Sequence, residues 1–245
     1  MKAKLYLIPT PLGGHAPSDV LPGPVMELIP RIHLWFVEEL RTARRFLSAA
    51  GWKGHVEELE LLEINEHSTR EEIEGYARRL GEEDAGLISE AGLPAVADPG
   101  ALLVELAHRR GIDVVPMVGP SSLMMALMAS GLNGQCFAFT GYLPVKTPAR
   151  REALLQLERT SARLGQSQII IETPYRNDSL LADILECCKP STRLCIAADI
   201  TCPDETVRTR SVSEWRTEVG KRFALGKRPC VFVLLAAGGV APKPM

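Results

Sequence analysis

Small residues fill the stretch from Ser89 to Gly100, which reads Ser-Glu-Ala-Gly-Leu-Pro-Ala-Val-Ala-Asp-Pro-Gly. Because few bulky side chains stand in the way, the backbone amides of such a loop can approach a ligand closely. The apolar run 85–88 predicts a buried parallel strand, and Asp98 and Pro99 predict the cap and first residue of a helix. Ligands of open α/β sheets bind at the carboxyl ends of strands. We therefore expect this loop to cradle a ligand, while Asp98 only caps the helix.

Two serines follow a Gly-Pro pair in the segment Gly119-Pro120-Ser121-Ser122, directly before an apolar run. The free amides at the start of a helix can bind an anionic or polar group of a ligand. A helix cap accounts for one serine, and the second favours a ligand contact at Ser121 and Ser122. A hydrolase triad in the usual order is disfavoured, because no histidine follows these serines in the sequence.

Charged residues gather where the second and third expected strands end. Glu38 and Glu39 follow the second strand, and Glu66 and His67 follow the third. A carboxylate at the start of a helix often only complements the helix dipole, and we interpret Glu39 in this way. For Glu38, Glu66 and His67 we favour a polar substrate surface, and these are the candidates for a general base.

A further carboxylate, Glu172, comes directly after the apolar run 169–171. Burying a charge at the end of such a strand is costly unless the charge is paired. Arg176 is the nearest candidate partner in the sequence. We expect the two side chains to form an ion pair.

Several classes of site are disfavoured by spacing. The first loop, Pro9-Thr10-Pro11-Leu12-Gly13-Gly14, lacks the Gly-x-Gly-x-x-Gly pattern, and the chain has no Gly-x-x-x-x-Gly-Lys motif. A nucleotide phosphate is therefore not the expected ligand. The six cysteines show no Cys-x-x-Cys spacing and the histidines no ligand spacing, so we expect reduced thiols and no metal.

Short apolar strands alternate with helical patterns through the first half, which predicts a doubly wound parallel sheet. We expect its strands at 5–8, 34–37, 59–64, 86–88 and 113–116, with helices at 25–29, 42–50, 70–80 and 99–110. The second half predicts a mixed sheet with strands at 136–140, 168–172, 193–198, 206–212 and 230–235, and helices at 121–130, 147–159, 175–188 and 213–222. The expected domains are residues 1–116, an N-terminal α/β domain, and 117–245, a C-terminal α/β domain.

The net charge of −2 hides an asymmetry between the two halves. Residues 1–115 hold 12 lysines and arginines against 19 acidic residues, whereas residues 116–245 hold 16 against 11. The basic second half is compatible with a nucleic-acid partner, although ordinary variation between two solvated surfaces explains it equally well. No window is apolar enough to span a membrane and no signal peptide opens the chain, so we expect a cytoplasmic protein.

Four segments taken together resemble the tetrapyrrole methylase superfamily of S-adenosylmethionine-dependent methyltransferases. They are Tyr6-Leu7-Ile8-Pro9-Thr10-Pro11-Leu12-Gly13, the loop from Ser89 to Gly100, Val118-Gly119-Pro120-Ser121-Ser122 and Glu172-Thr173-Pro174-Tyr175-Arg176. Within the superfamily they are most similar to the branch that methylates a cytidine ribose 2′-hydroxyl of bacterial 16S ribosomal RNA. The branch has Glu-Asp-Thr-Arg where this chain reads Glu38-Glu39-Leu40-Arg41.

The resemblance implies two α/β domains, a cofactor cleft between them and a homodimer. It implies S-adenosylmethionine as the cofactor, and it assigns cofactor contacts to Pro11, Ser89, Glu90, Ala91, Val96, Ser121, Ser122, Glu172 and Thr209. For the methyl acceptor we expect ribosomal RNA, contacted by basic residues of the second half such as Lys146, Arg150, Arg151 and Arg176. The alternatives are a methylase acting on a tetrapyrrole carbon and a non-catalytic, ribosome-associated protein that binds S-adenosylmethionine.

Overall fold

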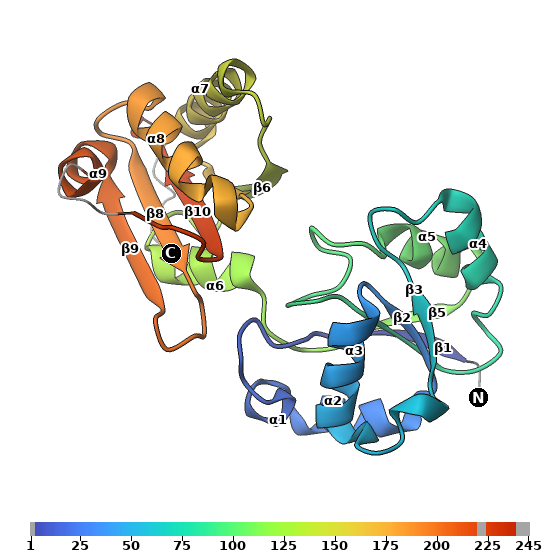
Figure 1. The fold of residues 1–245 in the computed structure, drawn as a ribbon. Coiled ribbons are helices and arrows are strands. Elements are labelled where there is room, and N and C mark those ends of the chain that lie inside the picture. The colour runs from blue at the N-terminus through green and yellow to red at the C-terminus, as the bar shows by residue number, and fades with distance from the viewer. Residues whose placement is uncertain (1–2, 220–223, 239–245) are drawn as a thin grey trace. The chain divides into compact units, whose positions relative to one another are not determined.

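The chain folds into two compact units, Met1–Ser121 and Ser122–Met245, and each unit has its own five-stranded sheet (Figure 1). The structure is a computed structural model and describes residues 3–219 and 224–238. The sequence analysis expects the domain boundary after residue 116, which is the end of the strand Asp113–Pro116. The first compact unit continues to Ser121.

The first sheet is parallel throughout. Its strands are β1 (Lys4–Leu7), β2 (Leu34–Val37), β3 (Glu60–Glu63), β4 (Ala85–Ile88) and β5 (Asp113–Pro116), in the spatial order β3-β2-β4-β1-β5. Strand β4 therefore pairs with β2 on one side and with β1 on the other. Parallel pairing places the carboxyl ends of all five strands at one edge of the sheet.

Helices cover both faces of this sheet, as the doubly wound prediction requires. They are α1 (Pro17–Val20), α2 (Gly23–Leu28), α3 (Leu40–Leu47), α4 (Arg70–Ala77) and α5 (Ala101–Arg109), with short turns at Ile29–Arg31, Ser48–Trp52 and Val56–Glu58. Alternate residues of β2 enter two different cores: Trp35 and Val37 belong to one, Leu34 and Phe36 to the other. Since side chains alternate across a strand, this is the pattern of a strand buried on both faces.

The second sheet is mixed, as predicted. Its strands are β6 (Phe137–Tyr142), β7 (Ser167–Ile171), β8 (Arg193–Ala198), β9 (Thr206–Ser211) and β10 (Cys230–Leu235), in the order β6-β7-β10-β8-β9. Within the described part of this sheet, only the β6–β7 pair is parallel, and the other three pairs are antiparallel. The helices are α6 (Ser122–Ser130), α7 (Thr147–Leu164), α8 (Asn177–Cys187) and α9 (Val212–Val219), with a short turn at Pro174–Arg176. Residues 220–222 of the helix expected at 213–222 lie outside the described residues.

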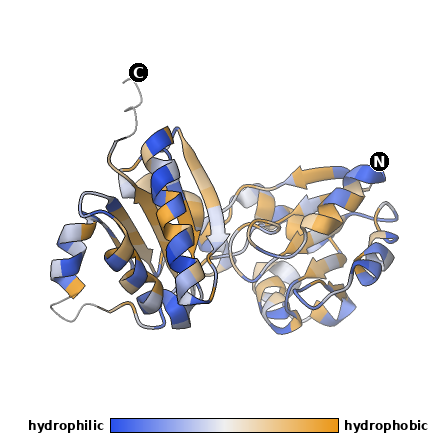
Figure 2. Cartoon of the chain, turned by 90° about the horizontal axis from the view of Figure 1, so that it is seen from above, coloured by the Kyte–Doolittle hydropathy of each residue, from blue (hydrophilic) through white to orange (hydrophobic). Residues whose placement is uncertain are grey.

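Hydrophobic residues concentrate in the sheets, whereas the helices also carry hydrophilic faces (Figure 2). In the second unit, Trp215 of α9 and Phe232 of β10 are fully buried in the same core. The six cysteines are free thiols. None of the helices within the described ranges is long and apolar enough to cross a membrane.

Gly86 in β4 lies against the indole ring of Trp35 in β2. A Cβ atom at position 86 would overlap that ring. The ring cannot easily move away, because it is fully buried and its Nε1 donates a hydrogen bond to the Ile32 carbonyl at 2.9 Å. The central pairing of the sheet therefore requires glycine at this position.

We predict that Gly86→Ala lowers the free energy of unfolding of the first unit by about 1–3 kcal/mol, the usual cost of overpacking a core. Urea titration monitored by tryptophan fluorescence measures the change. Gly23→Ala is the matched control, because a Cβ at the exposed start of α2 meets no atom within 4 Å. Equal stability of the two variants would contradict the packing argument.

Candidate functional site

Four loops of the first unit meet at the carboxyl edge of its parallel sheet. They follow β1, β2, β3 and β4, and they carry Thr10, Glu38, Glu66 and Ser89. Because β4 lies between β1 and β2, its loop is adjacent to the loops that follow both neighbours. This edge is where an open α/β sheet binds ligands. We call it the carboxyl edge below.

The loops after β2 and β4 are joined by a hydrogen bond. The backbone amide of Glu90 donates to Glu38 Oε2 at 3.0 Å. The Thr42 hydroxyl at the start of α3 donates to the Glu90 carboxylate at 3.5 Å. Two residues of the sequence prediction, Glu38 and Glu90, are thus brought together from positions 52 residues apart.

The loops after β1 and β4 are joined by their backbones. Thr10 and Gly92 exchange two hydrogen bonds, of 2.9 and 3.1 Å, and the Thr10 hydroxyl donates to the Ser89 carbonyl at 3.3 Å. Pro11 follows Thr10 directly, so the two predicted contacts Pro11 and Ser89 lie on loops that are tied together. The sequence analysis did not single out Thr10, although it lies within the first loop motif.

The backbone of the small-residue loop adopts a conformation that L-residues rarely take. Gly92 has a φ of +82°, and Ala95 and Ala97 have φ values of +63° and +65°. Left-handed backbone at a non-glycine residue is unfavourable, and such residues gather at functional sites. Val96 between the two alanines is exposed although it is apolar, and Glu90 and Ala91 are exposed as well.

The prediction that Asp98 caps the following helix is wrong. Helix α5 begins at Ala101, and its N-cap is Gly100, with a φ of +117°. Asp98 is instead a partly buried residue of the loop, and burial, together with the charge of Glu90, raises the pKa of its carboxyl, while the nearby Ser89 side chain opposes the rise. The Asp-Pro-Gly pattern is typical of a helix start, and the pattern does not distinguish a helix capped by Asp98 from one that begins after Gly100.

Glu38 is a half-buried carboxylate in an acidic surrounding. Burial raises the pKa of Glu38 above its ordinary value of 4.5; the Glu90 amide lowers it, and the charges of Asp98, Glu90 and Glu66 raise it further. Such a group binds a proton more readily than a solvated glutamate does. It is therefore suited to accept a proton from a substrate.

The other two predicted bases differ from Glu38 in their surroundings. Glu66 and His67 are highly exposed, and His67 Nε2 lies 3.6 Å from Glu66 Oε1. Glu66 acts on Glu38 through its charge. Glu39 stands at the start of a helix, as interpreted from the sequence: it is the N-cap of α3, and its carboxylate accepts from the amides of Arg41 and Thr42.

In the second unit, Glu172 follows β7 and forms the predicted ion pair with Arg176. Its Oε1 accepts from Arg176 Nε at 3.0 Å and from the Thr173 amide at 2.7 Å. Its Oε2 is buried and has no hydrogen-bond partner among the described residues. A buried carboxylate oxygen without a donor is costly, which makes it a candidate acceptor for a ligand.

The remaining predicted contacts lie on separate elements. Ser121 is the last residue of the first unit, and Ser122 begins α6 of the second. Thr209 lies in β9, and its hydroxyl donates to the Ser130 carbonyl at 2.6 Å. No hydrogen bond in the described part of the chain joins Ser122, Glu172 and Thr209 to one another. Nor does that part contain a cluster of histidine, cysteine and carboxylate side chains that could hold a metal ion.

Most of the basic residues expected to contact RNA form ion pairs with carboxylates of the second unit. Arg150 is 2% exposed, and its Nε donates to Asp183 Oδ2 at 2.6 Å. Arg151 pairs with Asp183 and Glu186, so both arginines tie α7 to α8. The prediction that Arg150 contacts RNA is therefore wrong, because removing it from this pair would leave a buried charge without a partner.

Known proteins resemble this chain over most of its length. The model of the tetrapyrrole (corrin/porphyrin) methylase family matches residues 33–215. A Neisseria meningitidis serogroup B protein named ribosomal RNA small subunit methyltransferase I is 31% identical over 234 residues, which are 95% of this chain and 76% of that protein. A protein of the same name from Pseudomonas aeruginosa is 32% identical over 240 residues, 98% of this chain and 80% of the relative.

Among solved structures, the fold is similar to that of uroporphyrin-III C-methyl transferase from Thermus thermophilus complexed with S-adenyl homocysteine. The TM-score is 0.54 at 18% identity, with 95% of this chain and 97% of that chain covered. The likeness concerns the fold, and the family match carries the assignment. The chain belongs to the tetrapyrrole methylase family, and it is an S-adenosylmethionine-dependent methyltransferase.

Proposed function

We propose that this enzyme methylates a ribose 2′-hydroxyl of ribosomal RNA of the small ribosomal subunit. The relatives from Neisseria and Pseudomonas carry names that point to this RNA. The observation that carries the choice of a hydroxyl is Glu38, a half-buried carboxylate with a raised pKa that the Glu90 amide holds at the carboxyl edge. A ribose hydroxyl is a weak nucleophile, and a positioned base assists its reaction by about 10²- to 10⁴-fold.

We propose that the small-residue loop binds S-adenosylmethionine through Ser89, Glu90, Ala91 and Val96, beside Pro11. S-adenosylmethionine supplies a methyl group on a positively charged sulfur. The loop fits such a group, because its exposed residues Ala91, Val96 and Ala97 are small or apolar and acidic residues such as Glu90 and Glu38 lie beside them. Carboxylates stabilise a nearby positive charge.

We propose further cofactor contacts at Ser121, the last residue of the first unit, and at Ser122, Glu172 and Thr209 of the second unit. The supporting observation is the buried Glu172 Oε2, which has no donor among the residues that the structure describes. S-adenosylmethionine carries amino and hydroxyl donors that can satisfy such an acceptor. Arg176 and the Thr173 amide hold the carboxylate in place through its other oxygen.

Of the three candidate bases, we propose that Glu38 takes the proton. Glu38 is fixed by a backbone amide and is partly withdrawn from water. Glu66 and His67 are solvated, and we propose that they contact the RNA or tune Glu38 by charge.

Reaction with ribosomal RNA also supports the expected cytoplasmic location.

We also propose that the protein acts as a homodimer. Strand β6 is an edge of the second sheet, and Phe137, Phe139, Tyr142 and Val145 on and after it are between 36% and 66% exposed. An exposed strand edge with several large apolar side chains favours association with another chain. A second copy would cover this apolar edge.

The first prediction concerns the methyl acceptor. With S-adenosylmethionine labelled in its methyl group, we expect label in 16S ribosomal RNA of small subunits and none in uroporphyrinogen. Alkali cleaves RNA through the free 2′-hydroxyl, so the labelled position should survive as an alkali-stable dinucleotide. Label on a base or on the tetrapyrrole would contradict the proposal, and tight cofactor binding without any transfer would favour a non-catalytic role.

The second prediction concerns Glu38. Glu38→Gln should lower kcat about 10²-fold or more, because the amide cannot accept the proton. A base works only when ionised, so wild-type activity should fall as the pH is lowered through the raised pKa of Glu38, at a pH above 4.5. The variant should lose this acid limb.

Glu39→Gln is the matched control, since this neighbouring carboxylate caps α3 and should leave the rate and its pH profile unchanged. Calorimetry with S-adenosylmethionine on both variants separates cofactor binding from the chemical step. If Glu38→Gln kept the wild-type rate and acid limb, Glu38 would not be the base.

The third prediction concerns the dimer. Light scattering should give twice the chain mass of 26.8 kDa for the wild type. Phe139→Lys should weaken association at least tenfold, about 1.4 kcal/mol, because it buries an unpaired charge in the interface. Leu164→Lys changes an exposed leucine outside β6 and should leave the mass unchanged. A monomeric wild type would rule out the dimer.

A further inference from the structure

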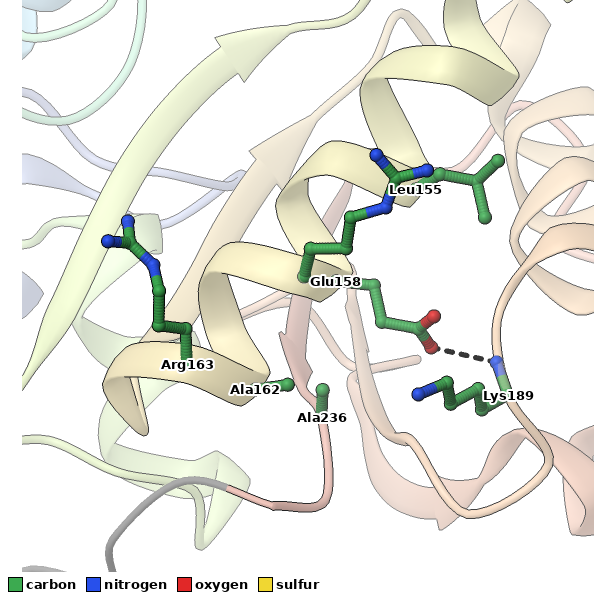
Figure 3. A pocket seen from close by; sticks show the side chains of 7 residues that line it. Leu155, Glu158, Ala162, Arg163, Lys189 and Ala236 are labelled. Carbon is green, nitrogen blue, oxygen red and sulfur yellow. Dashed lines mark hydrogen bonds between the residues drawn. The ribbon is translucent and has the colours of Figure 1, made fainter.

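A pocket of about 470 Å³ lies on the second unit, between α7 and the segments that follow α8 and β10 (Figure 3). Helix α7 contributes five of the residues that line it, Lys189 comes from the segment after α8, and Ala236 follows β10. The lining residues are Leu155, Glu158, Arg159, Ala162, Arg163, Lys189 and Ala236. None of them belongs to the candidate site described above.

Three of these side chains are exposed cations: Arg159, Arg163 and Lys189. None of the three forms an ion pair with a carboxylate in residues 3–219 or 224–238. They contrast with Arg150 and Arg151 on the same helix, whose charges are neutralised by Asp183 and Glu186. Like charges grouped in this way repel one another, so an anion bound among them would lower the energy of the group.

The spacing on α7 directs two of the cations to one side. Arg159 and Arg163 are four residues apart, and such residues lie one turn above the other on the same helix face. Arg163 lies in the last turn, where a cation also complements the helix dipole. That explanation does not extend to Arg159, one turn earlier. Figure 3 shows Arg163 and Lys189 on opposite sides of the pocket.

The one carboxylate in the lining, Glu158, is buried and already engaged. Its Oε1 accepts from the Lys189 amide at 2.7 Å and from the Thr192 hydroxyl at 2.5 Å. These bonds fasten the segment after α8 to α7 (Figure 3). Three cations against one carboxylate leave the pocket with a net positive charge.

The floor of the pocket is apolar and fixed. Ala162 and Ala236 both line it (Figure 3). The backbone at Ala236 is held in place, because its amide donates a hydrogen bond to the Ser161 hydroxyl at 2.9 Å. Leu155 adds a half-buried aliphatic side chain. A phosphate with a sugar attached matches this combination of cationic and small side chains.

We infer that this pocket binds a backbone phosphate of the RNA substrate, through Arg159, Arg163 and Lys189. The inference rests on the proposed function, because it takes RNA as the acceptor. Arginine binds phosphate oxygens through two parallel N–H donors, and lysine adds a mobile charge. The pocket thereby supplies the basic contact that the buried Arg150 cannot make.

The test measures RNA binding separately from methyl transfer. The triple variant Arg159→Gln, Arg163→Gln, Lys189→Gln is titrated against bare 16S ribosomal RNA at several salt concentrations. Loss of three phosphate contacts should reduce the slope of log K against log salt by about 2 to 3. The affinity for S-adenosylmethionine, measured by calorimetry, should stay at the wild-type value and shows that the variant is folded.

The matched control is Arg31→Gln, Arg45→Gln, Lys53→Gln, which removes two arginines and one lysine from exposed positions of the first unit. It should keep the wild-type salt slope. The variant Arg159→Lys, Arg163→Lys keeps both charges and should keep most of the slope while losing some affinity. An equal loss of slope in the triple variant and in its control would overturn the inference, because net charge alone would then explain it.

Inorganic phosphate and pyrophosphate form the second arm, since a free phosphate has the same chemistry as an RNA phosphate. If the triple variant lost binding of free phosphate but kept the RNA slope, the pocket would be a site for a free anion and the inference would be wrong. The proposed function fails separately, when the wild type transfers no methyl to RNA. A reduced RNA slope in the triple variant would still support the pocket in that case.

Discussion

The position of β4 between β1 and β2 is the constraint on which the candidate site depends. Parallel pairing on both sides of β4 brings the loop from Ser89 to Gly100 against the loops that follow β1 and β2. The hydrogen bonds of Thr10 with Gly92, and of Glu90 with Glu38, are consequences of that order. Gly86 makes the order possible, because only a residue without Cβ leaves room for the Trp35 ring.

The same edge concentrates acidic groups that repel one another. Glu38, Glu66, Glu90 and Asp98 come from three loops, and no lysine or arginine pairs with Glu38 or Asp98 in the described ranges. Their mutual repulsion and partial burial favour the protonated form of Glu38 and Asp98. This arrangement costs folding stability at neutral pH, which is the usual relation between a reactive site and the structure around it.

In the second unit, the decisive feature is which cations are already paired. Arg150 and Arg151 share Asp183 and join α7 to α8, while Arg159 and Arg163 further along α7 have no described carboxylate partner. The first two are structural and the last two are open to a ligand. The net charge of the chain includes all four arginines equally. Only an arginine without a carboxylate partner attracts a distant anion strongly.

Pattern alone determined the two kinds of sheet, the place of most strands, the ion pair of Glu172 with Arg176 and the position of Glu39 at the start of a helix. Each of these follows from neighbours in the sequence: apolar runs, turn residues, or charges within one helical turn. The residues quoted for the family resemblance also lie on contiguous segments. The tertiary structure decided that Gly100 and not Asp98 precedes helix α5, that Arg150 is buried, and that Glu38 meets the Glu90 amide. These outcomes depend on which strands become neighbours and on which charges find partners far along the chain, and neither is encoded in local spacing.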